Sequence, residues 1–189
     1  MKILYMMVTL GLLYGCVSKY PLKVNIDDYK NGLEITNSIV KTRNIFNSKV
    51  CILLDSSIPI TQELKDYYDK DVLYTFENKQ LVEKYQNNDG CNSENIIKIT
   101  NIESKYSWDG MMRLNLYKTE ISLESTYKCN NKNIKFTAIK EKKLKKHGKL
   151  IGLGIINERK TQALIAATIV LAFDEAISDI YNQIKSQCE

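Results

Sequence analysis

The apolar segment near the end of the chain constrains the fold more than any other part. Between about Arg159 and Lys185, apolar side chains recur at the spacing of one helical face. The stretch Ala163–Phe173 is apolar nearly all round, but it is shorter than the roughly 20 residues that span a bilayer. The pattern predicts a long core helix. Its polar side is marked by Asp174, Glu175, Asp179 and Gln183.

Three runs of alternating apolar and polar residues precede this helix. They predict strands at roughly 95–105, 111–129 and 133–146. The turn-forming residues Asn130–Asn133 join the last two strands as a hairpin. In the middle run the apolar residues change from even to odd positions, which predicts a β-bulge in that strand.

Shorter elements are predicted before these strands. Val50–Leu54 indicates a buried strand, Thr61 the N-cap of a helix, and residues 77–86 a second helix. The order of strand, helices, meander and long helix predicts an α+β fold. We expect an antiparallel β-meander of three to four strands with helices packed on one face, including the long C-terminal helix.

The first sixteen residues have the layout of a secretory signal. Lys2 is followed by the apolar stretch Ile3–Leu13 and then by Gly15 and Cys16. The segment resembles the lipobox of bacterial lipoproteins, in which the cysteine is lipidated and becomes the new N-terminus. An ordinary signal peptide and an uncleaved anchor are the alternatives.

Under this interpretation the chain has three parts. Residues 1–15 are a signal peptide that is removed, residues 16–48 are the lipidated cysteine and a tether, and residues 49–189 are a single domain. The domain is expected in the periplasm of a bacterial envelope. Val17 follows the cysteine where aspartate would retain a lipoprotein in the inner membrane, so the outer membrane is favoured.

Four cysteines remain beyond Cys16, an even number that suggests disulfides in an exported protein. We prefer the pairs Cys51–Cys91 and Cys129–Cys188, because the second pair pins the last helix to the sheet. Free, buried thiols are the alternative.

The overall charge is modest, since 27 Lys and Arg against 22 Asp and Glu give +5. Neither this balance nor an exported location favours nucleic acid as a partner. A basic run is the strongest local charge feature, and Lys142, Lys143, Lys145 and Lys146 are its candidate contacts with lipid headgroups. The alternative is a solvated strand end whose charges prevent edge-to-edge pairing.

Trp108, the only tryptophan, and Tyr106 lie where the first long strand ends. Aromatic side chains dominate interface energetics, so the two residues are a candidate partner surface. A lone tryptophan that covers the end of the core is the alternative.

The sequence does not favour catalysis. His147 is the only histidine and lies in a basic turn, and no cysteines or carboxylates have metal-ligand spacing. The glycines of residues 148–154 lack the phosphate-binding patterns GxGxxG and GxxxxGK[ST]. We therefore predict that the protein is not an enzyme and has no cofactor and no metal.

A Trp-Asp pair that enters a long strand, with a leucine five residues later, resembles a feature of some small bacterial envelope lipoproteins. Here these residues are Trp108, Asp109 and Leu114. The order of elements is also similar to that of YajG-type lipoproteins. The resemblance implies a fold type and an envelope location.

These features lead us to expect a membrane-anchored, non-catalytic binding or assembly accessory in the cell envelope, with an envelope protein as partner. A lipid- or glycolipid-binding module is the second hypothesis, and a hydrolase with an Asp, Glu or Ser site is the third. The sequence leaves the oligomeric state open.

The lipidation hypothesis predicts the chemistry of the mature N-terminus. Mass spectrometry of the protein purified from membranes should find Cys16 as the first residue, carrying a diacylglycerol and an acyl chain. The Cys16→Ala variant should lose this modification. An unmodified Cys16, or retention of residues 1–15, would refute the hypothesis.

Overall fold

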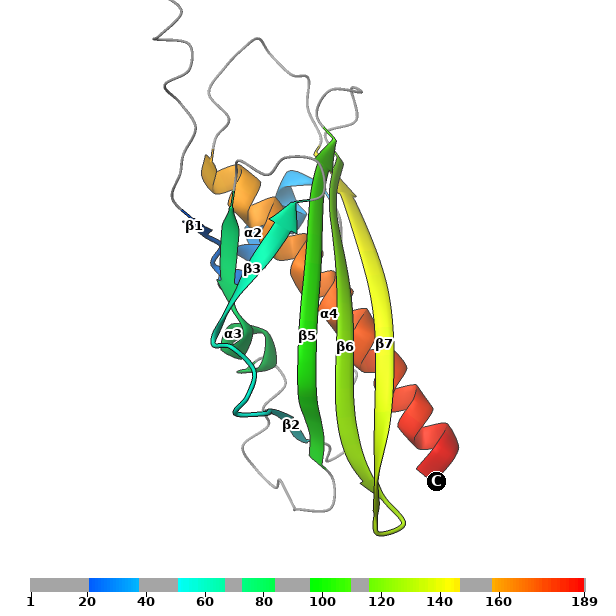
Figure 1. The fold of residues 1–189 in the computed structure, drawn as a ribbon. Coiled ribbons are helices and arrows are strands. Elements are labelled where there is room, and N and C mark those ends of the chain that lie inside the picture. Colours follow the sequence, from blue (N-terminus) through cyan, green and yellow to red (C-terminus); the bar gives the residue numbers. More distant parts are fainter. Residues whose placement is uncertain are drawn as a thin grey trace, which may run out of the picture.

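A mixed β-sheet and one long helix form the two main layers of the molecule (Figure 1). The structure, a computed structural model, describes residues 21–37, 51–66, 73–83, 96–109, 116–146 and 158–188. Helix α4 (Glu158–Cys188) has 31 residues and lies along one face of the longest strands. The prediction of a mixed α and β protein with a long C-terminal helix is confirmed.

Three strands of 14 residues each make up the main ladder, and they are β5 (Ile96–Asp109), β6 (Leu116–Cys129) and β7 (Lys132–Lys145). Both pairings are antiparallel. Asn130 and Asn131, between β6 and β7, have φ angles of 48° and 63°. Positive φ at both positions is what a two-residue hairpin turn with the right twist requires. The predicted three-stranded antiparallel unit is therefore present.

The remaining strands make the sheet mixed, so the expectation of a purely antiparallel meander is wrong. Strands β2 (Cys51–Leu54) and β3 (Thr61–Asp66) both pair with β5 in parallel. Strand β4 (Tyr74–Glu77) is antiparallel to β3, and β1 (Leu22–Lys23) is parallel to β4. The pairing of β3 with β5 covers only two residue pairs, so it joins a small sheet to the long ladder.

The helix predicted to begin at Thr61 is also wrong, because this residue starts strand β3. Thr61 pairs with Glu77 and Leu64 pairs with Tyr74, and Leu64 is fully buried. Pairing with β4 therefore overrides the capping pattern, as tertiary context commonly does. The second predicted helix is present as α3 (Asn78–Glu83), within the expected 77–86.

A β-bulge lies in β5, whereas the parity change predicted for the middle strand begins at Met112 and Leu114, outside the described residues. Ile99 pairs with Ser125, whereas Asn101 pairs with Glu124, so Thr100 is the extra residue. The buried positions accordingly change from Ile97 and Ile99 to Ile102, Ser104 and Tyr106. Strand β6 pairs with β7 without a shift from Leu116 to Cys129.

The domain begins earlier than predicted, because residues assigned to a tether pack against the core. The short 3-10 helix η1 (Ile26–Asp28) is followed by α2 (Tyr29–Ile35). Val24 and Ile26 are fully buried, and Leu33 is almost so. Residues 22–35 of the predicted tether therefore belong to the folded domain.

Helix α4 is buried on all sides in its first half. Every residue from Ala163 to Phe173 is buried, since the long strands cover one side and α2 and η1 cover the other. From Ile177 onward only the side that faces the sheet stays apolar, with Ile180 and Ile184 also buried. This change explains why the sequence is apolar all round at first and amphipathic later.

Helix α2 approaches α4 most closely at Gly32. A Cβ atom placed there would lie 2.1 Å from the carbonyl oxygen of Ala163 and 2.8 Å from the Cβ of Ala167. The first of these contacts is with backbone, which cannot move without moving the helix. Glycine on one helix and alanines on the other therefore permit this crossing.

A single methyl group at this crossing should destabilise the protein. We expect Gly32→Ala to lower the free energy of unfolding by about 1–3 kcal/mol through overpacking. The cost of overpacking should exceed the roughly 1 kcal/mol by which alanine favours a helix over glycine, so the net effect is destabilising. Chemical denaturation measures this, with the exposed Lys30→Ala on the same helix as control. A Gly32→Ala variant as stable as the parent would contradict the close approach.

A disulfide links the main ladder to helix α4. Cys129 ends β6 and Cys188 ends α4, with Cα atoms 5.5 Å apart and a sequence separation of 59. This is the pairing that the sequence favoured. Cys51 is also disulfide-bonded, but Cys91 lies outside the described residues, so the pair Cys51–Cys91 stays a prediction.

Removal of the Cys129–Cys188 link should destabilise the domain through the unfolded chain. Closing a loop of this length is worth about 4 kcal/mol in the chain-entropy treatment. We expect the double variant Cys129→Ala/Cys188→Ala to lose a stability of that order in denaturant titration. The neighbouring exposed pair Lys128→Ala/Lys185→Ala is the matched control. An unchanged denaturation midpoint for the cysteine variant would refute a structural role.

Candidate functional site

The basic run of β7 is divided between the two faces of the sheet. Lys140 and Lys142 lie on the face covered by α4, where Lys140 contacts Asp179 at 2.9 Å and Lys142 pairs with Glu175. One turn further along α4, Gln183 donates a hydrogen bond of 3.0 Å to the carbonyl oxygen of Thr137.

The three α4 residues of these contacts are spaced four apart, so they form one row along the helix. They connect the polar side of α4 to β7, which is an edge strand of the described sheet. The prediction that Lys142 contacts headgroups is corrected, because its ammonium group binds Glu175 within the fold.

Lysines on the opposite face of the sheet form a second set of ion pairs. Glu141 binds Lys118 on the neighbouring strand and Lys143 at 2.7 Å. These two cations, Lys118 foremost, hold the pKa of the Glu141 carboxyl below its ordinary value. Lys143 is thus part of this second set of ion pairs. Of the four lysines predicted to contact headgroups, Lys145 and Lys146 are the two without an ion pair among the described residues.

Trp108 is the exposed aromatic residue at one end of the long ladder. The residue is 38% exposed, and its ring centroid lies 6.4 Å from that of Tyr117 on β6. Tyr117 itself is buried, and burial raises the pKa of its phenol despite a hydrogen bond with Thr161 of α4. Trp108 therefore rests on a side chain that is held between sheet and helix.

Tyr106 does not share this exposure, so its assignment to a partner surface is wrong. It is 3% exposed and packs edge-on against Tyr74, with ring centroids 5.6 Å apart. The bulge at Thr100 turns the later even positions of β5 toward the interior. Trp108 has the same parity, but β3 pairs no further along β5 than Tyr106.

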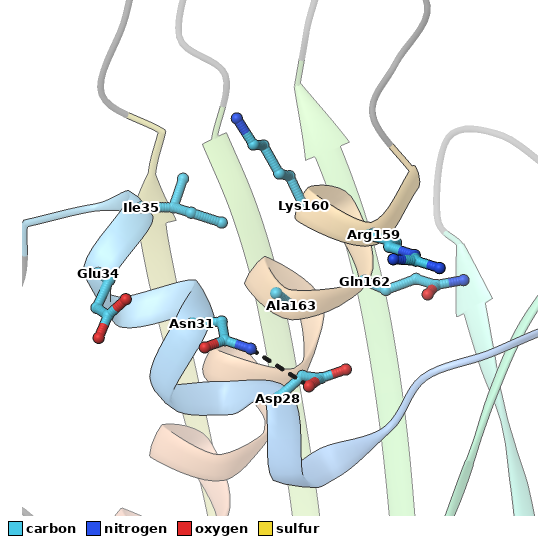
Figure 2. A pocket seen from close by; sticks show the side chains of 8 residues that line it. All are labelled: Asp28, Asn31, Glu34, Ile35, Arg159, Lys160, Gln162 and Ala163. Atoms are coloured by element: carbon cyan, nitrogen blue, oxygen red, sulfur yellow. Dashed lines mark hydrogen bonds between the residues drawn. The ribbon is translucent and has the colours of Figure 1, made fainter.

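A shallow groove separates α2 from the first turns of α4 (Figure 2). Its volume is about 750 Å³. Acidic side chains reach it from η1 and α2, and basic side chains from α4. The lining residues are Asp28, Asn31, Glu34, Ile35, Arg159, Lys160, Gln162 and Ala163.

Within the groove, Asn31 donates a hydrogen bond of 3.3 Å to the Asp28 carboxylate. Figure 2 shows Asp28, Arg159 and Gln162 on one side, while Glu34 points away from them. A tether over residues 16–48, as predicted from the sequence, leaves no place for this groove. Ile26, Tyr29 and Leu33 recur at helical spacing, and this signal could have revealed the helix.

Four residues lie toward the same end of the molecule, and we call them the Trp108 end. They are Trp108, Lys145, Lys146 and Arg159; Lys145 is on the face of the sheet opposite to Trp108. The row Asp109–Leu116–Lys145 crosses the ladder, so Trp108 and Lys145 belong to adjacent rows two strands apart, or about 10 Å. Arg159 lies in the first turn of α4, beside the Thr161 that contacts Tyr117.

The first described strand also starts in this half of the domain. Leu22 pairs with Tyr74, and the ring of Tyr74 packs on Tyr106. Tyr106 is two residues before Trp108, which is about 7 Å along a strand. Strands β4 and β3 lie between β1 and β5, so Leu22 is level with the half of β5 that ends at Trp108 but three strands away from it.

Other charged groups have structural explanations. The pKa of Asp55 is lowered to about 2, chiefly by its bond with Lys98 and then by hydrogen bonds from Ser57. This is a surface ion pair next to β2. Across the described ranges no three His, Cys, Asp or Glu side chains gather as metal ligands would. His147 and Cys16 lie outside those ranges.

None of the helices in the described part of the chain is long and apolar enough to cross a bilayer. Besides Trp108, exposed large apolar side chains include Ile60, Ile139 and Leu53. Ile139 lies on β7 and the other two on or after β2. Scattered apolar residues of this kind are ordinary on protein surfaces.

Comparisons with known proteins leave the site to be judged on its geometry. No family model, curated protein or solved structure matches the chain. The resemblance to YajG-type lipoproteins therefore stays a prediction.

Proposed function

We propose that the protein is a lipid-anchored, non-catalytic binding or assembly accessory of the bacterial envelope, and that it contacts an envelope protein through Trp108 and the adjoining groove. The anchor is Cys16, and the domain lies in the periplasm, at the outer membrane. The observation that carries this proposal is the exposure of Trp108 on a rigid support.

The surroundings of Trp108 also fit a residue that binds a partner protein. Tryptophan is enriched among the residues that dominate binding energy, particularly where its support is already ordered. Tyr117 provides that order, because it is buried and bonded to Thr161. Little side-chain freedom would then be lost when a partner covers Trp108.

The groove supplies polar groups at the same end of α4, on the side of the helix that faces α2. Arg159 is exposed at its rim, and Asp28 faces the same side. A protein surface with charges of both signs would complement such an arrangement, and polar groups around an aromatic centre are usual in transient interfaces.

The interior of the domain argues against a lipid-holding cavity between sheet and helix. Phe136 of β7 is buried, and Phe173 of α4 is fully buried. Ile121, Leu123 and Ile177 are likewise fully buried. Side chains thus fill the layer where an acyl chain would have to enter, which favours a surface contact over the lipid-carrier hypothesis.

Crosslinking in intact cells followed by affinity purification tests the proposal. A protein enriched with the native chain should be lost with Trp108→Ala. It should be retained with Ile139→Ala, which removes another exposed apolar side chain from the ladder. Equal thermal unfolding of both variants would show that the fold is unchanged. A partner retained equally by Trp108→Ala, or none enriched by the native chain, would refute the proposal.

A further inference from the structure

The covalent length of the chain limits how far the Trp108 end can lie from a lipid anchor at Cys16. Six residue steps separate Cys16 from Leu22. A fully extended chain of that length spans about 20 Å. Leu22 lies three strands from β5, level with the half of β5 that ends at Trp108 rather than with the half that begins at Ile96. An anchored domain would therefore hold the Trp108 end closer to its own membrane than the hairpin turn at Asn130.

Cations are concentrated on this end. Lys145 and Arg159 are exposed and Lys146 is half-buried, and none of the three has an ion-pair partner among the described residues. Lys160, in the same turn as Arg159, adds a fourth positive charge. Asp28 and Glu34 are the acidic side chains described nearby, and both belong to the groove wall formed by η1 and α2.

We propose that the Trp108 end rests on the anionic headgroup layer of the membrane that holds the anchor, with Lys145, Lys146 and Arg159 as the phosphate contacts. The inference rests on the proposed lipid anchor. It deepens the proposed function, since a protein that contacts Trp108 would then have to lie in or on the same membrane.

Tethering favours this occupant over a free anionic molecule. An anchor within about 20 Å presents headgroups to the domain at a high effective concentration, so weak individual contacts suffice. Lysine and arginine are attracted to anionic lipid surfaces, and tryptophan is favoured at the level of the headgroups. Both kinds of residue are present on the end of the ladder that is nearer in level to Leu22.

The lysines that form ion pairs within the fold are not among the proposed phosphate contacts. Lys142 binds Glu175 and Lys143 binds Glu141, whereas Lys145 lies past both at the end of β7. At the opposite end of the same hairpin, Lys128 and Lys132 are exposed beside the turn at Asn130. They supply a control with the same change of charge.

Fluorescence of the single tryptophan can test the orientation in the full, lipidated chain. The protein is reconstituted into vesicles of phosphatidylcholine, with or without phosphatidylglycerol, that contain lipids spin-labelled near the headgroup. We expect quenching of Trp108 in the phosphatidylglycerol vesicles and its loss at high salt, which screens exposed charges. Lys145→Glu/Lys146→Glu should lose the quenching, whereas Lys128→Glu/Lys132→Glu should keep it.

Three results would overturn the inference: no quenching in either vesicle, equal quenching without phosphatidylglycerol, or equal loss in both double variants. Flotation of the protein with the vesicles reports the anchor separately. Chains that do not float would refute the proposed anchor, whereas chains that float without quenching would refute only the orientation. Inorganic phosphate added at constant ionic strength should leave the quenching of Trp108 in the phosphatidylglycerol vesicles unchanged. Loss of the quenching would mean that free phosphate occupies the cations, and it would refute the membrane contact.

Discussion

The burial of the first half of α4 between two layers is the interaction on which the rest of the structure depends. From Ala163 to Phe173 no side is left for solvent, so the helix needs both the long strands and a cover on its back. That cover is α2, and it reaches α4 because Gly32 has no side chain opposite Ala163. Segments at opposite ends of the sequence therefore complete one core.

The polar half of α4 follows from the same arrangement. Once the first half fixes the helix axis over β6 and β7, Glu175, Asp179 and Gln183 come to lie along β7. Partly exposed ion pairs contribute little each, typically 0.2–1 kcal/mol. Their main effect here is on charge, because they neutralise Lys140 and Lys142 and leave positive charge concentrated at the end of the strand.

Local periodicity was sufficient for the elements whose apolar pattern is long. It predicted α4, the three long strands and the hairpin turn, since each carries its own repeated signal. It failed where the partner is distant in sequence. Thr61 looks like a helix cap until β4 pairs with it, and α2 has only seven residues. The groove and the burial of Tyr106 depend on such distant contacts, so neither could be read from the residues that form them.

The place where β1 joins the sheet connects the proposed anchor at Cys16 with the proposed membrane contact. Strand β1 is only two residues long, yet its pairing with β4 determines where the N-terminal segment leaves the domain. Had β1 joined the sheet at the far end, an anchor at Cys16 would face the hairpin turn and the Cys129–Cys188 disulfide. Because it pairs with Tyr74 instead, the N-terminal segment joins the half of the domain that also carries the exposed tryptophan and the lysines that the helix does not neutralise. The proposed membrane-facing orientation of this end therefore draws on the topology of the sheet as well as on composition.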